Sequence, residues 1–121
     1  MKVVTFMKQG ILVVRLDGEL DVCGANEFRT SVDDALDLTG AKHILLNMQE
    51  VSFIDSSGLG VILGRYKRIT QQGGKILVVH LAPQVKRILE LAGLMKLLTI
   101  YQSEEQALDI VYGGYSNGNS D

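Results

Sequence analysis

The sequence is poor in the residues that build metal sites and disulfides. Its 121 residues include one cysteine, Cys23, two histidines, His43 and His80, one proline and no tryptophan. A single cysteine cannot form an intramolecular disulfide, and one cysteine with two histidines is too few for a zinc cluster. We therefore expect no metal and no cofactor, and a reducing, cytoplasmic setting suits such a chain.

Long apolar runs and an excess of charge of one sign are also missing. No stretch approaches the roughly 18 apolar residues that span a membrane, and the apolar run near the N-terminus is too short for a secretory signal. Lysine and arginine number 12 against 14 aspartates and glutamates, a formal net charge of −2. Proteins that bind the nucleic-acid backbone carry a basic excess. We therefore expect no membrane partner and no direct nucleic-acid partner.

The composition is sufficient for one folded domain. Apolar residues make up 46% of the chain, and a chain of this length buries about two-thirds of the surface that it exposes when unfolded. We predict one domain over residues 1–112. Residues 113–121 contain three glycines, two serines and two asparagines, which predicts a flexible C-terminal tail.

Short apolar runs alternate with segments of helical periodicity. Strands are expected at residues 3–7, 11–16, 44–48, 75–81 and 97–101, with a short extended piece at 51–54 and a turn at 18–21. Helices are expected to begin near residues 26, 57, 83 and 104, the last of them at the capping box of Ser103 and Gln106. This alternation favours an α/β fold with a mixed, mostly parallel sheet and flanking helices, in which the first strand is free to run antiparallel at an edge.

The motifs that carry enzymatic chemistry are incomplete. Neither Ser56 nor Ser57 has the glycine two places earlier that a nucleophile elbow requires. The run Gly58-Leu59-Gly60 starts a dinucleotide fingerprint that fails at its sixth position, and no lysine of a P-loop follows the glycines. We therefore expect a protein that is not an enzyme.

The remaining reactive side chains have structural explanations. Asp21 and Asp55 each follow a strand-like segment; such a pair would suit acid/base catalysis, but helix capping and turn hydrogen bonds explain each of them too. Cys23 is interpreted as a small buried or half-buried filler in preference to a reactive thiol. His43 and His80, at the ends of predicted strands, are expected to pack or to make one hydrogen bond.

The helix expected at Ser57 has two different faces. Its large apolar residues gather toward the sheet: Leu59, Ile62, Leu63, Tyr66 and Ile69. The opposite face carries Ser57, Gly60, Val61, Gly64 and Arg68. A glycine inside a helix costs about 0.5–1 kcal/mol relative to alanine, so two on one outer face favour the close approach of a partner. Coverage of this face by another element of the same chain is the alternative.

The N-terminal end of that face suits a phosphoryl group. Ser57 and Gly58 are expected beside unpaired N–H groups at the positive end of the helix, although Asp55 opposes further negative charge. A phosphoryl group adds about −1.5 to −2 charges, which is large for a chain that carries −2. A purely structural role of Ser56 or Ser57 as the helix N-cap is the alternative.

Several segments together resemble the anti-sigma factor antagonists of the STAS domain family. They are residues 18–21 (G-E-L-D), 51–63 with the core D-S-S-G-L-G, 73–74 (G-G), 85–89 and 92–94. The similarity covers roughly residues 3–112 and extends to the sporulation members of the family. It implies a mixed, largely parallel sheet with flanking helices, and a protein that is a substrate and binding module.

The resemblance also implies a phosphorylation switch. Unphosphorylated members bind an anti-sigma factor that is also a serine kinase, which then releases its sigma factor and permits sporulation transcription. The kinase uses ATP to phosphorylate the serine before the glycine of D-S-S-G, here Ser57, and a serine phosphatase of the 2C type reverses this. Asp21 and Asp55 match acidic positions around that serine. A small nucleotide-binding regulatory domain and a piece of a larger STAS-containing regulator remain as alternatives.

Overall fold

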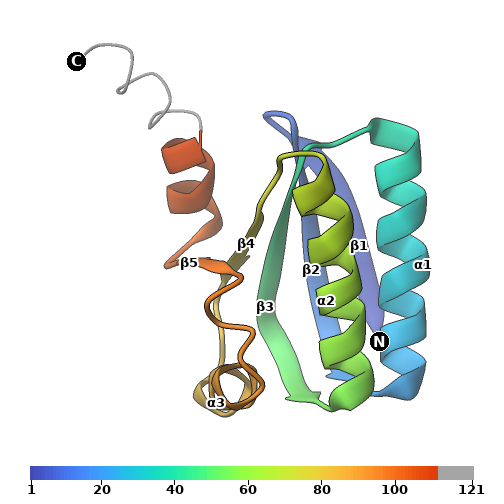
Figure 1. Cartoon of the computed structure of the whole chain (residues 1–121), viewed down its shortest axis with the longest axis vertical. Coiled ribbons are helices and arrows are strands. Elements are labelled where there is room, and N and C mark those ends of the chain that lie inside the picture. The colour runs from blue at the N-terminus through green and yellow to red at the C-terminus, as the bar shows by residue number, and fades with distance from the viewer. Residues whose placement is uncertain (112–121) are drawn as a thin grey trace.

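Five strands form one mixed sheet whose order follows the chain (Figure 1). In the computed structural model, which describes residues 1–111, the order is β1 (Lys2–Lys8), β2 (Ile11–Leu20), β3 (His43–Ile54), β4 (Ile76–Val79) and β5 (Thr99–Tyr101). β1 runs antiparallel to β2, and every other neighbouring pair is parallel. The predicted α/β class and the antiparallel edge strand are confirmed. The tail predicted at residues 113–121 lies outside the described residues.

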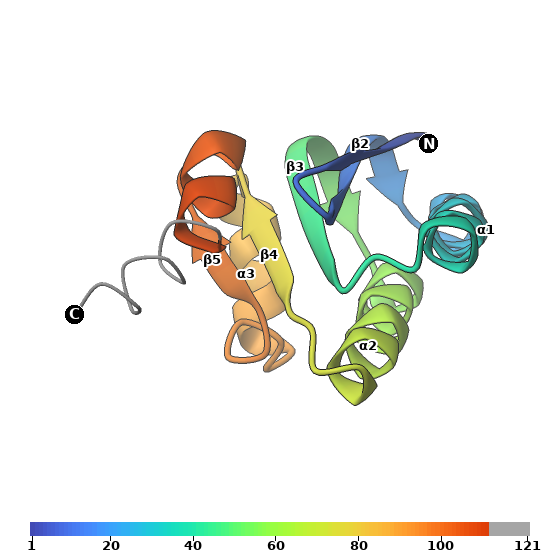
Figure 2. The ribbon, with the colours of Figure 1, turned by 90° about the horizontal axis from the view of Figure 1, so that it is seen from above.

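Helices cover both faces of this sheet. They are α1 (Val22–Thr39), α2 (Ser56–Gln71), α3 (Pro83–Leu91) and a last helix at residues 104–111. Figure 2 shows α1, α2 and α3 on one side of the strands, while the last helix lies on the other side beside β4 and β5. Because each central strand is covered on both faces, its sequence is a nearly continuous apolar run.

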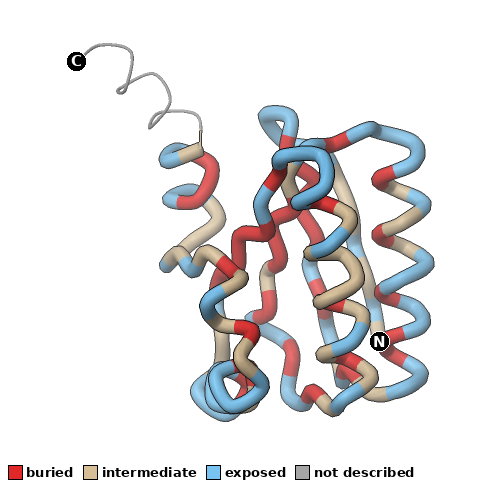
Figure 3. The backbone as a smooth tube through the Cα atoms, viewed as in Figure 1, coloured by how far each residue is buried: buried red, intermediate tan, exposed pale blue. Residues whose placement is uncertain are grey.

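The core consists of two clusters that share the strands. Alternate strand residues such as Leu12 and Ile44 pack with Phe28 of α1 and other side chains of the three helices. The strand residues between them pack with Leu108 of the last helix and its neighbour Ala107. Figure 3 shows this burial along the strands and along the inner sides of the helices.

The second and third strands are longer than the sequence predicts. Residues 18–21 are not a turn, because β2 continues to Leu20, and the piece at 51–54 is the end of an unbroken β3. The glycine signal at Gly18 marks an irregularity of strand pairing instead: the register shifts beside it, and its φ of 127° favours glycine. Both strands therefore reach one edge of the sheet together.

The last helix is capped as the sequence predicts. The Ser103 hydroxyl accepts from the Gln106 N–H at 3.0 Å, and the Gln106 side chain accepts from the Gln102 N–H at 2.7 Å. Glu104, in the first turn, accepts from Arg15 of β2 at 2.8 and 2.9 Å and from the Asn47 side chain of β3 at 2.8 Å. These charge-assisted bonds fasten the helix to the sheet.

Candidate functional site

The ends of β2 and β3 bring two helix starts together. Leu20 and Ile54 are partners in the parallel register, and the Asp55 N–H donates to the Leu20 carbonyl at 3.2 Å. The next residue along each strand is an aspartate, and α1 and α2 begin directly after it. Asp21 and Asp55 therefore lie at neighbouring positions at the carboxyl edge of the sheet, where α/β proteins bind their ligands.

Each aspartate caps the helix that follows it. The Asp55 Oδ1 accepts from the Ser57 N–H at 2.8 Å and from the Gly58 N–H at 3.2 Å, and the Asp21 Oδ1 accepts from the Gly24 N–H at 2.9 Å. The capping explanation for the two aspartates is confirmed. The alternative that a serine is the N-cap is wrong, because an extended residue with a carboxylate, Asp55, occupies that position.

This capping changes what a phosphoryl group would meet at Ser57. The N–H groups of Ser57 and Gly58 were expected to be unpaired, but both already donate to Asp55. Ser57 is half-buried, whereas Ser56 beside it is exposed. The helix start therefore offers a serine hydroxyl and a nearby carboxylate, with two of its amide donors occupied.

Gly58 holds the first turn of α2 directly against the strands. A Cβ at this position would lie 2.4 Å from the Leu20 carbonyl oxygen and 2.8 Å from the Ile54 Cγ1. Gly24 has the same function in α1, where a Cβ would lie 2.0 Å from the Glu19 carbonyl oxygen. No side chain fits at either glycine, so both helices begin in close contact with strand backbone.

The two helix starts have the same local design. Residues 21–24 (D-V-C-G) and 55–58 (D-S-S-G) each consist of a capping aspartate, two helical residues and a packed glycine. Cys23 is thus the positional counterpart of Ser57. Its predicted burial is wrong: the thiol is exposed, because this position of the first turn faces outward. The repeated D-x-x-G after a strand was the signal for α1, which begins at Val22 and not near residue 26.

A shallow groove runs between the first turns of α1 and α2. It has a volume of about 460 Å³ and is lined by Val22, Cys23, Ala25, Asn26, Arg29, Ser57 and Val61. The sequence did not single out Asn26 and Arg29. A larger hollow of about 820 Å³ lies around Arg15 and Glu104, on the face of the sheet that carries the last helix. None of the predicted site residues lines it.

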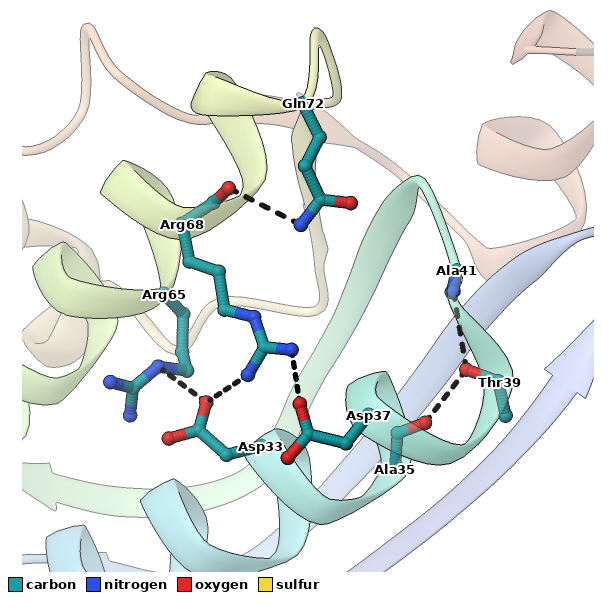
Figure 4. A network of polar contacts seen from close by, with 8 residues as sticks. All are labelled: Asp33, Ala35, Asp37, Thr39, Ala41, Arg65, Arg68 and Gln72. Carbon is teal, nitrogen blue, oxygen red and sulfur yellow. Dashed lines mark hydrogen bonds and ion pairs between the residues drawn. The ribbon is translucent and has the colours of Figure 1, made fainter.

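α1 covers one side of the face expected to meet a partner. The guanidinium of Arg68 bonds to Asp37 at 2.5 Å and to Asp33 at 3.3 Å, as Figure 4 shows. Val61 packs against the core. Another element of the same chain, α1, thus partly covers Arg68, whereas Val61 also lines the groove. Gly60 and Gly64 differ, because a Cβ at either would meet no atom within 4 Å.

Arg65 of α2 also contacts α1, and its side-chain N–H groups have few hydrogen-bond partners. Its side chain is 12% exposed, and its Nε lies 3.2 Å from Asp33 in an ion pair without hydrogen-bond geometry (Figure 4). Burial lowers the pKa of Arg65; Asp33 opposes this, while the like charges of Arg29 and Arg68 add to it. Arg29 and Arg68 are thus each close enough to Arg65 for their positive charges to interact with it.

Two further observations concern all described residues. Within residues 1–111, no helix has the length and apolar character needed to span a bilayer. In the same part of the chain, histidines, cysteines, aspartates and glutamates form no group of three that could hold a metal ion.

Comparisons with known proteins identify the family. The STAS domain model matches residues 3–107. An anti-sigma F factor antagonist of Paenibacillus polymyxa is 46% identical over 100 residues, which cover 83% of this chain and 86% of the relative. The anti-sigma factor antagonist SpoIIAA in its unphosphorylated form superposes with a TM-score of 0.81 at 29% identity, covering 93% of this chain and 97% of that one. The phosphorylated Bacillus SpoIIAA superposes with a TM-score of 0.72 at 28% identity, covering 91% and 99%. This chain therefore belongs to the STAS domain family, in which its relatives are anti-sigma factor antagonists.

Proposed function

We propose that this protein is a cytoplasmic anti-sigma factor antagonist that phosphorylation of Ser57 switches off. Its unphosphorylated form binds an anti-sigma factor, which then releases a sigma factor that activates sporulation transcription. The relatives named as antagonists support the role, and the solved SpoIIAA structures include a phosphorylated form. The observation that carries the proposal is Ser57 itself, a serine hydroxyl at an Asp-capped helix start that lines a groove between two helices.

The chemistry of the switch requires a hydroxyl from this chain and enzymes from elsewhere. In the proposed reaction the anti-sigma factor, acting as a serine kinase, forms a bond between the Ser57 oxygen and the γ-phosphorus of ATP. The bond from that phosphorus to the bridging oxygen breaks, ADP leaves and the hydroxyl proton passes to solvent. A serine phosphatase of the 2C type hydrolyses the phosphoserine and restores the binding form.

The partner surface is proposed to extend from Ser57 along the open side of α2. Gly60 and Gly64 leave room for close backbone approach there, since no atom lies within 4 Å of a Cβ at either position. Val22, at 68% exposed, and Phe53, at 42% exposed, border the same helix starts and add apolar area. A dianion beside these apolar side chains and glycines would disfavour docking through the cost of its desolvation.

Phosphorylation and binding can be tested in one set of experiments. After incubation with the cognate anti-sigma factor and ATP, mass spectrometry should find one phosphoryl group on Ser57, and Ser56→Ala should be modified like the wild type. Ser57→Asp should bind the anti-sigma factor at least tenfold more weakly with an unchanged circular dichroism spectrum, since a charge buried at an interface costs more than about 1.4 kcal/mol. Equal binding by Ser57→Asp and wild type contradicts the switch. Stoichiometric nucleotide binding that does not depend on Ser57 would favour a nucleotide-binding regulatory domain instead.

Two matched pairs of variants test the partner surface. Gly64→Arg places a long side chain on the open face and should weaken binding without loss of stability, whereas Gly64→Ala should bind normally. Arg68→Ala removes a proposed partner contact along with its bonds to α1. Asp37→Ala removes one of those bonds and leaves the arginine in place. Weaker binding by Arg68→Ala alone supports a partner contact, while equal effects of both assign Arg68 to the helix interface.

A further inference from the structure

The groove beside Ser57 contains one charged side chain. Of the seven residues that line it, only Arg29 carries a charge. We propose that Arg29 is the phosphate-binding residue of the switch, and that its guanidinium forms an ion pair across the groove with a phosphoryl group on Ser57. This inference rests on the proposed function, in which Ser57 is phosphorylated, and it identifies the part of the chain that holds the phosphate.

The capping aspartates already occupy three of the amide donors at the two helix starts. The N–H groups of Ser57 and Gly58 donate to Asp55, and the Gly24 N–H donates to Asp21. A phosphoryl group on Ser57 would therefore meet occupied donors and two carboxylates that repel it. A cation would offset this repulsion, and the one charged side chain that lines the groove, Arg29, comes from α1.

The geometry of Arg29 satisfies this need. Long side chains on a helix run back toward its N-terminus, and the Arg29 Nη2 donates to the side-chain oxygen of Asn26, three residues earlier, at 2.5 Å. This bond directs the guanidinium along the groove toward the first turns, where Ser57 lies. Arg29 is exposed and takes part in no ion pair among residues 1–111. Its remaining N–H groups are free for bidentate contact with phosphate oxygens.

Among the charged groups around Ser57, Arg29 is the one that can offset the negative charge of a phosphoryl group. Asp21 and Asp55 raise the cost of a dianion at Ser57, and the Cys23 thiol across the groove adds no positive charge. Arg65, deeper between the helices, is already paired with Asp33. The second pKa of the phosphoserine should therefore report the balance between two repelling carboxylates and one attracting guanidinium.

Titration of a phosphorylated chain tests the proposal directly. Phosphoserine is placed at position 57 during translation, and the second pKa of the phosphate is followed by ³¹P NMR in the full chain. Arg29→Gln removes the charge but keeps a side chain that can bond to Asn26, and Arg87→Gln, an exposed arginine of α3 outside the groove, is the matched control. Arg29→Gln should raise the phosphate pKa by about half a unit, the size expected for an exposed ion pair. Added salt should reduce this difference.

The possible outcomes separate the inference from the proposed function. Equal phosphate pKa values in Arg29→Gln and Arg87→Gln overturn the assignment of Arg29. If Arg29→Gln folds poorly, the charge is tested with Arg29→Lys and Arg29→Ala. A phosphate pKa that is close to the wild-type value in Arg29→Lys and higher in Arg29→Ala supports the charge contact. Equal phosphate pKa values in Arg29→Ala and the wild type overturn it. Because the phosphoserine is installed without a kinase, the result stands whether or not an anti-sigma factor modifies Ser57. Tight anti-sigma factor binding by the phosphorylated chain would refute the proposed switch and leave the Arg29 contact intact.

Discussion

The α-carbon of Gly58 faces the carbonyl oxygen of Leu20 so closely that a Cβ would lie 2.4 Å from it. The glycine of the D-S-S-G segment therefore has a packing function that is independent of any partner. It allows the first turn of α2 to rest on the end of β2, and so it fixes the position of Ser57 beside α1.

Gly58→Ala should lower the free energy of unfolding by about 2–3 kcal/mol, because the strand backbone cannot move away from the added methyl group. Gly60→Ala is the matched control: the same change on the open side of α2 should raise stability by about 0.5–1 kcal/mol through helix propensity. Urea denaturation followed by circular dichroism measures both. Similar effects of the two variants would show that the close contact at Gly58 does not matter.

Asp55 combines a capping function with a charge near the proposed phosphorylation site, and two variants separate them. Asp55→Ala should cost about 1 kcal/mol of stability, since the N–H groups of Ser57 and Gly58 lose their acceptor. Asp55→Asn retains an acceptor and should lose less, because asparagine is a comparable N-cap. Thermal melting at constant pH distinguishes them, and an equal loss from both would assign the effect to charge instead of capping.

Arg65 should be replaceable without loss of stability. Its Nε and Nη1 are buried without a hydrogen-bond partner within the described part of the chain, and burial lowers its pKa. Replacing a buried, incompletely satisfied cation by an apolar side chain of similar length is often neutral or stabilising. Arg65→Met should therefore leave the urea midpoint unchanged or raise it. A loss above about 1 kcal/mol would mean that the ion pair with Asp33 outweighs the desolvation of both groups.

Glu104 should make the last helix sensitive to acid. Hydrogen bonds from Arg15, and then from Asn47, hold the pKa of Glu104 below its ordinary value of 4.5, against the opposing effect of burial. A carboxyl whose pKa is lower in the folded state stabilises the fold above its unfolded pKa, and this contribution disappears as the pH falls through the folded pKa. Stability should thus decline below about pH 4.5 more steeply in the wild type than in Glu104→Gln. Urea denaturation at a series of pH values measures this, and an equal loss of unfolding free energy at low pH in the two proteins would contradict the assignment to Glu104.

Much of the fold follows from local sequence signals. The apolar runs at residues 44–48 and 75–81 predict β3 and β4, although β3 is longer and β4 is shorter than its run. These runs are nearly continuous because both faces of the strands are covered, and periodicity and turn residues locate the helices between them. Ser103 and Gln106 predict the start of the last helix, and the structure has the corresponding bonds. The turn predicted at Gly18 is wrong because a glycine required by a strand irregularity has the same signature in the sequence as one required by a turn.

The site was only partly predictable, because its remaining features depend on how two helices lie together. The D-S-S-G segment identifies Ser57 and Asp55 from the sequence alone. Arg29 and the Arg68 contacts with Asp33 and Asp37 require that α1 and α2 lie side by side, and helical periodicity within one segment does not give that arrangement. Gly64 is open and Arg68 is partly covered because α1 lies against only one side of α2, and this too cannot be derived from the sequence of α2 alone.

The occupied helix starts have a consequence for small anions. Helix N-termini with open amide donors attract free phosphate and sulfate, and at cellular concentrations such ions would occupy the position of a regulatory phosphate and imitate it. The side chains of Asp21 and Asp55 already accept from three of these donors, the N–H groups of Gly24, Ser57 and Gly58, and add repulsion. If phosphorylation of Ser57 is the signal, this arrangement weakens the competition from free anions, which lack the covalent bond that holds a phosphoryl group at Ser57.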